Sequence, residues 1–102
     1  MLDDIKKIAD HYGKDAQLGM LQEECAELIQ AVSKYRRAGM PLIDDYNHIV
    51  EEIADVEIVI SQVKHLLKIP DYAVEFIKVE KVSRQIERIK DEEDREHENG
   101  NC

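Results

Sequence analysis

Residues 44–67 read DDYNHIVEEIADVEIVISQVKHLL, and this stretch decides the fold. Its apolar residues recur every three or four positions, which is the spacing of one face of an α-helix. That face consists of Ile49, Ile53, Val56, Ile60, Val63 and Leu67. Val50, Ala54, Ile58 and Val59 widen it beyond what one neighbouring helix can cover. The stretch therefore predicts a long helix covered on more than one side, with a second subunit supplying the extra cover.

Helical spacing also dominates the rest of the chain, and no segment shows the sustained alternation of a β-strand. Three further helices are expected, at about residues 3–11, 15–38 and 72–90. Gly13, Gly39 and Pro70 mark the breaks between them, because glycine and proline interrupt helices. The predicted fold is all-α, an antiparallel bundle of four to five helices completed by homo-oligomerisation.

The length and composition indicate a single domain over residues 1–90 and an acidic tail over 91–102, expected to be frayed. A formal net charge of −9 argues against nucleic acids and anionic membranes as partners. No apolar run is long enough for a membrane span, and the N-terminus lacks the pattern of a signal peptide. The two cysteines do not suggest a disulfide framework, so the cytoplasm is the expected location.

Two acidic clusters lie on the two longest predicted helices. Glu23, Glu24 and Glu27 form the pattern Glu-Glu-x-x-Glu, and Glu52 with Asp55 forms Glu-x-x-Asp. Residues three apart share a helix face, so antiparallel packing would direct these carboxylates into one space. Mg²⁺ takes carboxylate oxygens together with waters and substrate phosphates, which suits phosphoryl chemistry. A solvated acidic helix face has the same spacing, and spacing alone leaves that alternative open.

Residues 20–34 and 50–56, which carry these motifs, resemble the MazG-type all-α nucleoside triphosphate pyrophosphohydrolases. The resemblance covers about residues 15–90. It implies a homodimer or homotetramer that hydrolyses a nucleoside triphosphate to the monophosphate and pyrophosphate, using Mg²⁺, with Mn²⁺ able to replace it. It further implies that Glu23 binds a further metal or deprotonates the attacking water. The implied Mg²⁺ ligands are Glu24, Glu27, Glu52 and Asp55.

The resemblance also implies phosphate contacts from basic residues on the helix after the second motif. The basic stripe in that region consists of Lys81, Arg84 and Arg88. Ordinary helix salt bridging also accounts for it, since Glu80 lies four residues before Arg84. Gln85 stands where a common form of the family has a second basic residue. Gln22, just before the first acidic motif, is a further candidate substrate contact.

The remaining polar residues and the alternative functions have weaker support in the sequence. The basic residues Lys34, Arg36 and Arg37 are accounted for by interaction with the helix dipole. The histidines lack the spacing of a zinc site. An inactive helical oligomerisation or adaptor protein remains an alternative function. A di-iron carboxylate bundle is disfavoured, because neither acidic motif contains the Glu-x-x-His pairing that such sites use.

Overall fold

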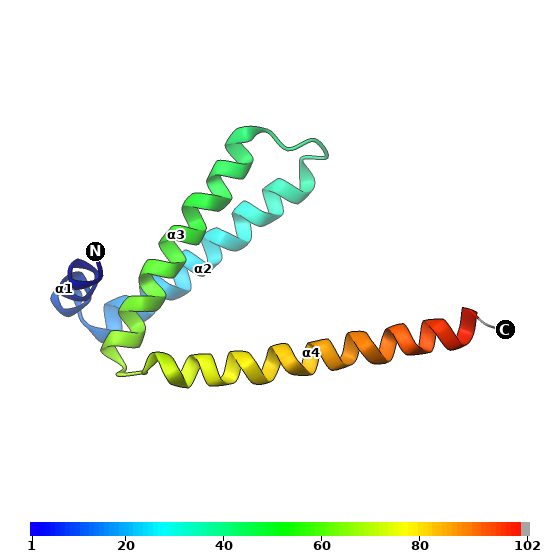
Figure 1. The fold of residues 1–102 in the computed structure, drawn as a ribbon. Coiled ribbons are helices and arrows are strands. Elements are labelled where there is room, and N and C mark those ends of the chain that lie inside the picture. Colours follow the sequence, from blue (N-terminus) through cyan, green and yellow to red (C-terminus); the bar gives the residue numbers. More distant parts are fainter. Residues whose placement is uncertain (101–102) are drawn as a thin grey trace. The chain divides into compact units, whose positions relative to one another are not determined.

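The computed structural model describes residues 1–100, and all of its regular secondary structure is helical (Figure 1). Helix α1 spans Leu2–Tyr12, α2 spans Lys14–Arg37, α3 spans Ile43–Leu66 and α4 spans Asp71–Gly100. Among these described residues there is no strand, which confirms the all-α fold class. None of the four helices combines the length and the apolar character needed to cross a bilayer. The chain divides into two compact units between Ile69 and Pro70.

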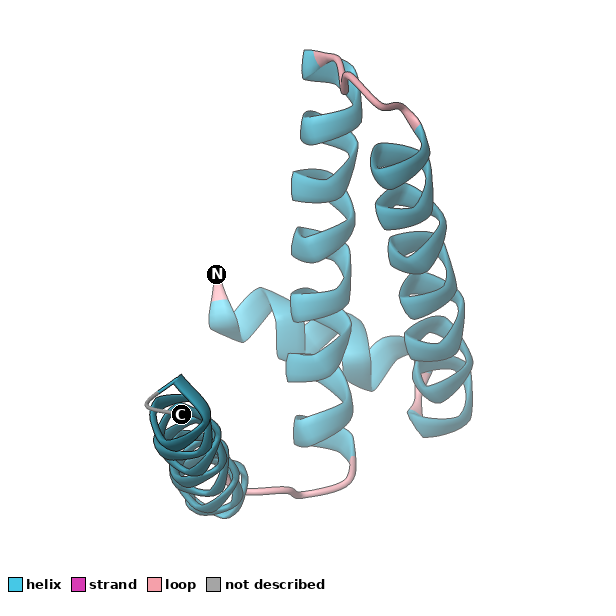
Figure 2. Cartoon of the chain, turned by 90° about the vertical axis from the view of Figure 1, so that its right-hand side faces the viewer, coloured by secondary structure: helices cyan, strands magenta, loops and turns pink. Residues whose placement is uncertain are grey.

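The first unit is an antiparallel pair of long helices with a short helix across one end. Figures 1 and 2 show α2 and α3 side by side, with α1 crossing near the start of α2 and the end of α3. The apolar residues buried in this unit are small or β-branched: Ala9, Ala31, Val56, Val59 and Val63. Many larger apolar residues on α2 and α3 are exposed, because a pair of packed helices covers only the faces that meet.

Two glycines in left-handed conformations make the tight turns of this unit. Gly13 has φ +91° and separates α1 from α2 by a single residue, while its N–H donates to the Ala9 carbonyl at 2.8 Å. Gly39 has φ +63° and follows the end of α2, as the sequence predicts. At the start of α3, the Asp45 carboxylate accepts a hydrogen bond from the Leu42 N–H at 3.0 Å. These features fix where α2 ends and α3 begins.

A buried polar contact joins all three helices of the first unit. The Gln17 side-chain Nε2 on α2 donates to the side-chain Oε1 of Gln62 on α3, and both residues are buried. The Gln62 amide in turn donates to the Ile5 carbonyl on α1 at 3.4 Å. His65 on α3 and Asp10 on α1 also pair, at 2.8 Å. Because buried polar groups are costly without partners, these contacts favour one register between α2 and α3.

The second unit consists mainly of α4, which differs from the prediction at its end. Residues 91–100, predicted to fray, continue the helix to Gly100, while residues 101–102 lie outside the described part. Glutamate and arginine, which are good helix formers, fill much of this segment, and the Arg95 Nε donates to the Asp91 carbonyl at 3.4 Å. The spacing of the apolar residues on this helix predicts a side that faces inward, but no residue of α4 is buried. That apolar side is exposed in the single chain: Phe76, Val79, Val82, Ile86 and Ile89.

Candidate metal centre

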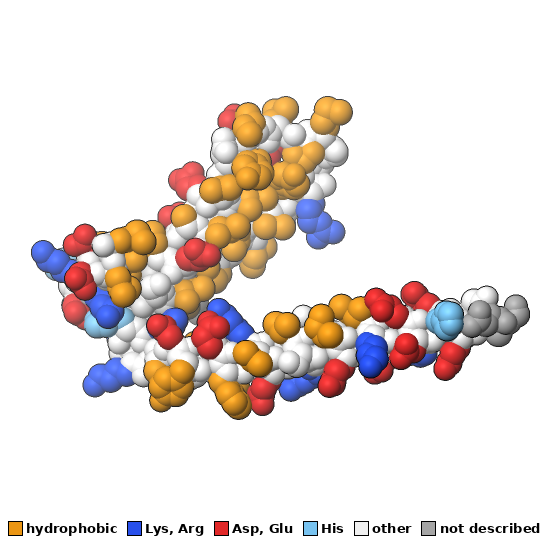
Figure 3. Space-filling view, viewed as in Figure 1, with side chains coloured by type: hydrophobic (Ala, Val, Ile, Leu, Met, Phe, Trp, Pro, Cys, Tyr) orange, Lys and Arg blue, Asp and Glu red, His pale blue; other side chains and the backbone are white. Residues whose placement is uncertain are grey.

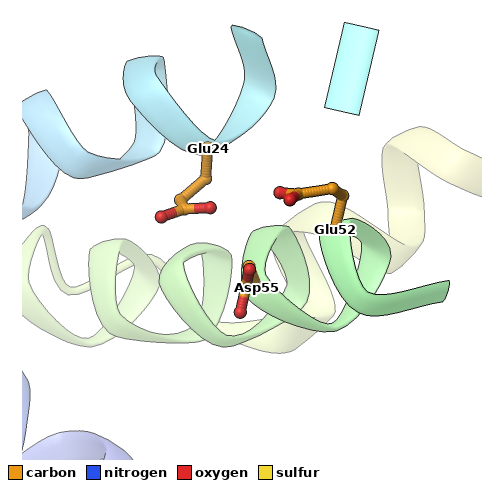
Figure 4. Close-up of side chains that lie close together, drawn as sticks. All are labelled: Glu24, Glu52 and Asp55. Atoms are coloured by element: carbon orange, nitrogen blue, oxygen red, sulfur yellow. The ribbon is translucent and has the colours of Figure 1, made fainter. Parts of the chain in front are cut away.

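Carboxylates from α2 and α3 converge where the two helices pack. Figure 4 shows Glu24 extending from α2 toward α3, where Glu52 and Asp55 stand on successive turns. One oxygen from each of the three carboxylates lies within 4.8 Å of the other two. The antiparallel packing therefore brings together residues that are about 30 positions apart in the sequence.

Burial makes this cluster different from a solvated acidic surface. Glu52 is only 6% exposed, and Glu24 is half-buried. The Oε2 atoms of Glu24 and Glu52 are shielded from solvent and have no hydrogen-bond partner among the described residues. An unpaired buried carboxylate oxygen is costly, and native proteins rarely leave one without a proton, a donor or a cation.

The electrostatics of the cluster also indicate that the carboxylates need a compensating proton or cation. Burial raises the pKa of Glu24 above its ordinary value, and the neighbouring charges of Glu27 and then Asp55 raise it further. Burial also raises the pKa of Glu52, with Glu27 and Asp55 again the main charged contributors. His48 partly opposes this rise, because its Nε2 lies 3.3 Å from the Glu52 Oε1. The site thus disfavours its own ionised carboxylates unless a positive charge compensates them.

The arrangement fits a hard divalent cation. Mg²⁺ binds oxygen at about 2.0–2.1 Å, so opposed ligand oxygens around it are about 4.2 Å apart. The separations within the cluster are bounded by 4.8 Å, and small side-chain rotations would close the difference. Three carboxylates leave further coordination positions for water and for phosphate oxygens, which is the usual way in which Mg²⁺ is held.

Three other candidates for this site occupy different environments. Glu27 is half-buried and close enough to raise the pKa values of Glu24 and Glu52, although it is not one of the three carboxylates that share the 4.8 Å space. Glu23 and Gln22 are both exposed on α2. Metal binding by Glu27 stays a prediction, as do the roles of Glu23 in catalysis and of Gln22 in substrate binding.

The three basic candidates for phosphate contact lie on α4. Helix α4 belongs to the second unit. The three basic side chains on it are all exposed: Lys81, Arg84 and Arg88. Their phosphate contacts stay a prediction. His48, in contrast, is not among the candidate site residues of the sequence, and it lies against the cluster. Its position one helical turn before Glu52 is the signal that could have indicated this contact.

Comparisons of the chain with protein-family models, with curated proteins and with solved structures give no match. The resemblance to the MazG-type pyrophosphohydrolases thus remains an interpretation of the two acidic motifs and their order. What supports a function is the chemistry of the carboxylate cluster itself.

Proposed function

We propose that this protein is a Mg²⁺-dependent nucleotide pyrophosphohydrolase, which converts a nucleoside triphosphate to a monophosphate and pyrophosphate. The observation that carries the proposal is the convergence of Glu24, Glu52 and Asp55, with two buried carboxylate oxygens lacking partners. A metal site whose protein ligands are all oxygen atoms, with coordination positions left open for phosphate, is typical of enzymes that act on polyphosphates.

The acidic residues divide between metal binding and catalysis in this proposal. Glu24, Glu52 and Asp55 hold the ion, and the half-buried Glu27 beside them is the proposed fourth ligand. The bound Mg²⁺, or Mn²⁺ in its place, neutralises charge on the triphosphate oxygens. Glu23 is exposed and free to orient a water molecule and to accept its proton. The water oxygen forms a new bond to phosphorus, a phosphoanhydride bond breaks, and pyrophosphate leaves.

A homodimer or homotetramer is the proposed functional form. Large apolar side chains are exposed on α3, including Val50 at 49% and Ile53 at 42%, and on α4, including Phe76 at 64%. Figure 3 shows hydrophobic side chains gathered over α2 and α3, and others along α4. Exposed apolar surface of this extent is characteristic of protein–protein contacts, and a second copy of the chain would bury it.

This oligomer predicts that a charge on the apolar side of α4 causes dissociation. Ile86→Asp is expected to shift the sedimentation-derived mass toward the monomer value of 11.8 kDa, because the buried charge would cost more than the contact stabilises. Gln85→Asp, at the neighbouring exposed position, is the matched control and should leave the mass unchanged. If both Ile86→Asp and Gln85→Asp kept the sedimentation-derived mass of the unmodified protein, the apolar side of α4 would have no role in oligomerisation.

The reaction itself is tested with a panel of nucleoside triphosphates. Pyrophosphate release should depend on Mg²⁺, be restored by Mn²⁺ and disappear with a chelator. The preferred base and sugar would follow from the same measurement. No turnover of any nucleotide, together with no affinity for Mg²⁺, would favour the inactive oligomerisation or adaptor protein instead.

A further inference from the structure

A second feature of the first unit is a cavity of about 440 Å³ between α2 and α3. It lies toward the end of α2 and the beginning of α3 and is partly open to solvent. Five of its six lining residues carry polar or cationic side chains: Ile29 is the exception among Ile29, Gln30, Ser33, Lys34, Arg37 and His48. Hydroxyl, amide, imidazole, ammonium and guanidinium groups are all present in this lining, and each can donate a hydrogen bond to an anion.

This cavity adjoins the carboxylate cluster. His48 lines the cavity, and its Nε2 lies 3.3 Å from the Oε1 of Glu52. Along α2, Glu27 and Lys34 are two turns apart on the same side, which corresponds to about 10 Å along the helix axis. One side of α2 therefore changes from acidic to basic between the carboxylate cluster and the cavity.

The cationic groups of the cavity are available to a ligand. Among residues 1–100, the Lys34 ammonium makes a single, long ion pair, with Asp45 at 3.9 Å, and its side chain is 65% exposed. The Asp45 carboxylate already accepts a hydrogen bond from the Leu42 N–H. Arg37 is exposed and, in the described part of the chain, its guanidinium makes no ion pair or hydrogen bond. An arginine guanidinium matches two phosphate oxygens at once, so Arg37 is suited to phosphate.

We infer that this cavity binds the part of the substrate that leaves as pyrophosphate, with Lys34 and Arg37 as its cationic contacts. This inference rests on the proposed function, since it needs the rest of the triphosphate at the carboxylate cluster. It gives the basic end of α2 a role beyond the helix dipole, and it places phosphate contacts within the same unit as the acidic residues. The substrate is then an anion with at least two linked phosphates, and pyrophosphate is a competitive product inhibitor.

The inference is tested by calorimetric titration of the whole chain with inorganic pyrophosphate, once with Mg²⁺ and once with a chelator. Arg37→Gln is expected to weaken pyrophosphate binding about tenfold in both conditions, because a charge-assisted contact is lost. Arg36→Gln removes the same charge from the adjacent exposed residue, which does not line the cavity, and should leave the affinity unchanged. Mg²⁺ affinity, titrated alone, should be the same in all three proteins.

The outcomes separate the cavity from the metal centre. If Arg36→Gln and Arg37→Gln weakened pyrophosphate binding equally, the effect would be one of general charge, and the inference would be overturned. No effect of either variant, or no pyrophosphate binding by the unmodified protein, would also overturn it, while normal Mg²⁺ binding would leave the proposed function in place. Pyrophosphate binding that depends on Arg37, in a protein without Mg²⁺ affinity, would instead contradict the proposed function and retain the cavity as an anion site.

Discussion

Replacing Glu24 with Gln, or Asp55 with Asn, is expected to lower the rate of nucleotide hydrolysis at least about a hundredfold while leaving the helix content unchanged. Each change removes one of the charged oxygen ligands that converge between α2 and α3, and keeps nearly the same side-chain shape. Electrostatic stabilisation by a bound metal contributes several kcal/mol to such reactions, and about 2.7 kcal/mol corresponds to a hundredfold in rate. Steady-state pyrophosphate release and far-ultraviolet circular dichroism measure the two effects.

The matched control is Glu57→Gln, which removes an exposed carboxylate from the same helix as Asp55. It should retain full activity and the melting temperature of the unmodified protein, because surface substitutions have small effects. Parallel losses of activity and melting temperature in Glu24→Gln and Asp55→Asn would identify these acids as structural. An unchanged rate would remove them from the reaction altogether.

The spacing of residues in the sequence predicts the four helices, apart from residues 91–100 of α4, and indicates that the acidic motifs can meet. The apolar stripe of residues 44–67 predicts α3 almost to its ends, and Gly39 marks the end of α2. In the antiparallel pair, Glu24 faces the helix that carries Glu52 and Asp55. Helical periodicity determines which residues share a face, and short connections determine which helices are neighbours.

The burial of each side chain and its hydrogen-bond partners could not be predicted from spacing in the same way. Glu23 and Glu24 are adjacent in the sequence, yet Glu23 is exposed and the Oε2 of Glu24 is shielded and unpaired. That difference depends on how closely α3 approaches, and the approach depends on small core residues and on the buried pair of Gln17 and Gln62. Neither glutamine stood out in the sequence, because a buried amide pair has no local signature.

The cavity was missed for a related reason. Lys34 and Arg37 lie where basic residues commonly end a helix, so the helix dipole accounted for them without any ligand. Only the course of α3 adds His48 to the same space and gives the basic residues a cavity to line. Similarly, the apolar side of α4 has the spacing of a buried face, but periodicity does not distinguish burial within one chain from burial against another.

Glu52→Gln is expected to stabilise the metal-free protein at neutral pH and to abolish its stabilisation by Mg²⁺. The pKa of Glu52 is raised above its ordinary value of 4.5, chiefly by burial. Between that value and the raised pKa, the folded state binds more protons than the unfolded chain, so the free energy of unfolding falls as pH rises. The destabilisation is absent below the ordinary pKa and complete above the raised one. Removing the charge removes this dependence.

Thermal melting of the two proteins in a chelator, followed from pH 5 to pH 8, measures the effect. The melting temperature of Glu52→Gln should exceed that of the unmodified protein near pH 8, and the difference should shrink toward pH 5. Glu51→Gln, at the adjacent exposed position, is the control and should follow the unmodified protein. Identical pH profiles for Glu52→Gln and the unmodified protein would contradict a raised pKa at this residue.

Addition of Mg²⁺ should reverse the order of stability. A ligand that binds only the folded state stabilises it by about 2.7 kcal/mol when present at a hundred times its dissociation constant. The unmodified protein should gain this amount, because the cation compensates the ionised carboxylates of Glu24, Glu52 and Asp55 together. Glu52→Gln keeps a neutral amide in the same space and should gain little. A cluster that existed only to hold the helices together would respond to the charge removal but not to the metal, so the combined response distinguishes a metal site from buried acidic packing.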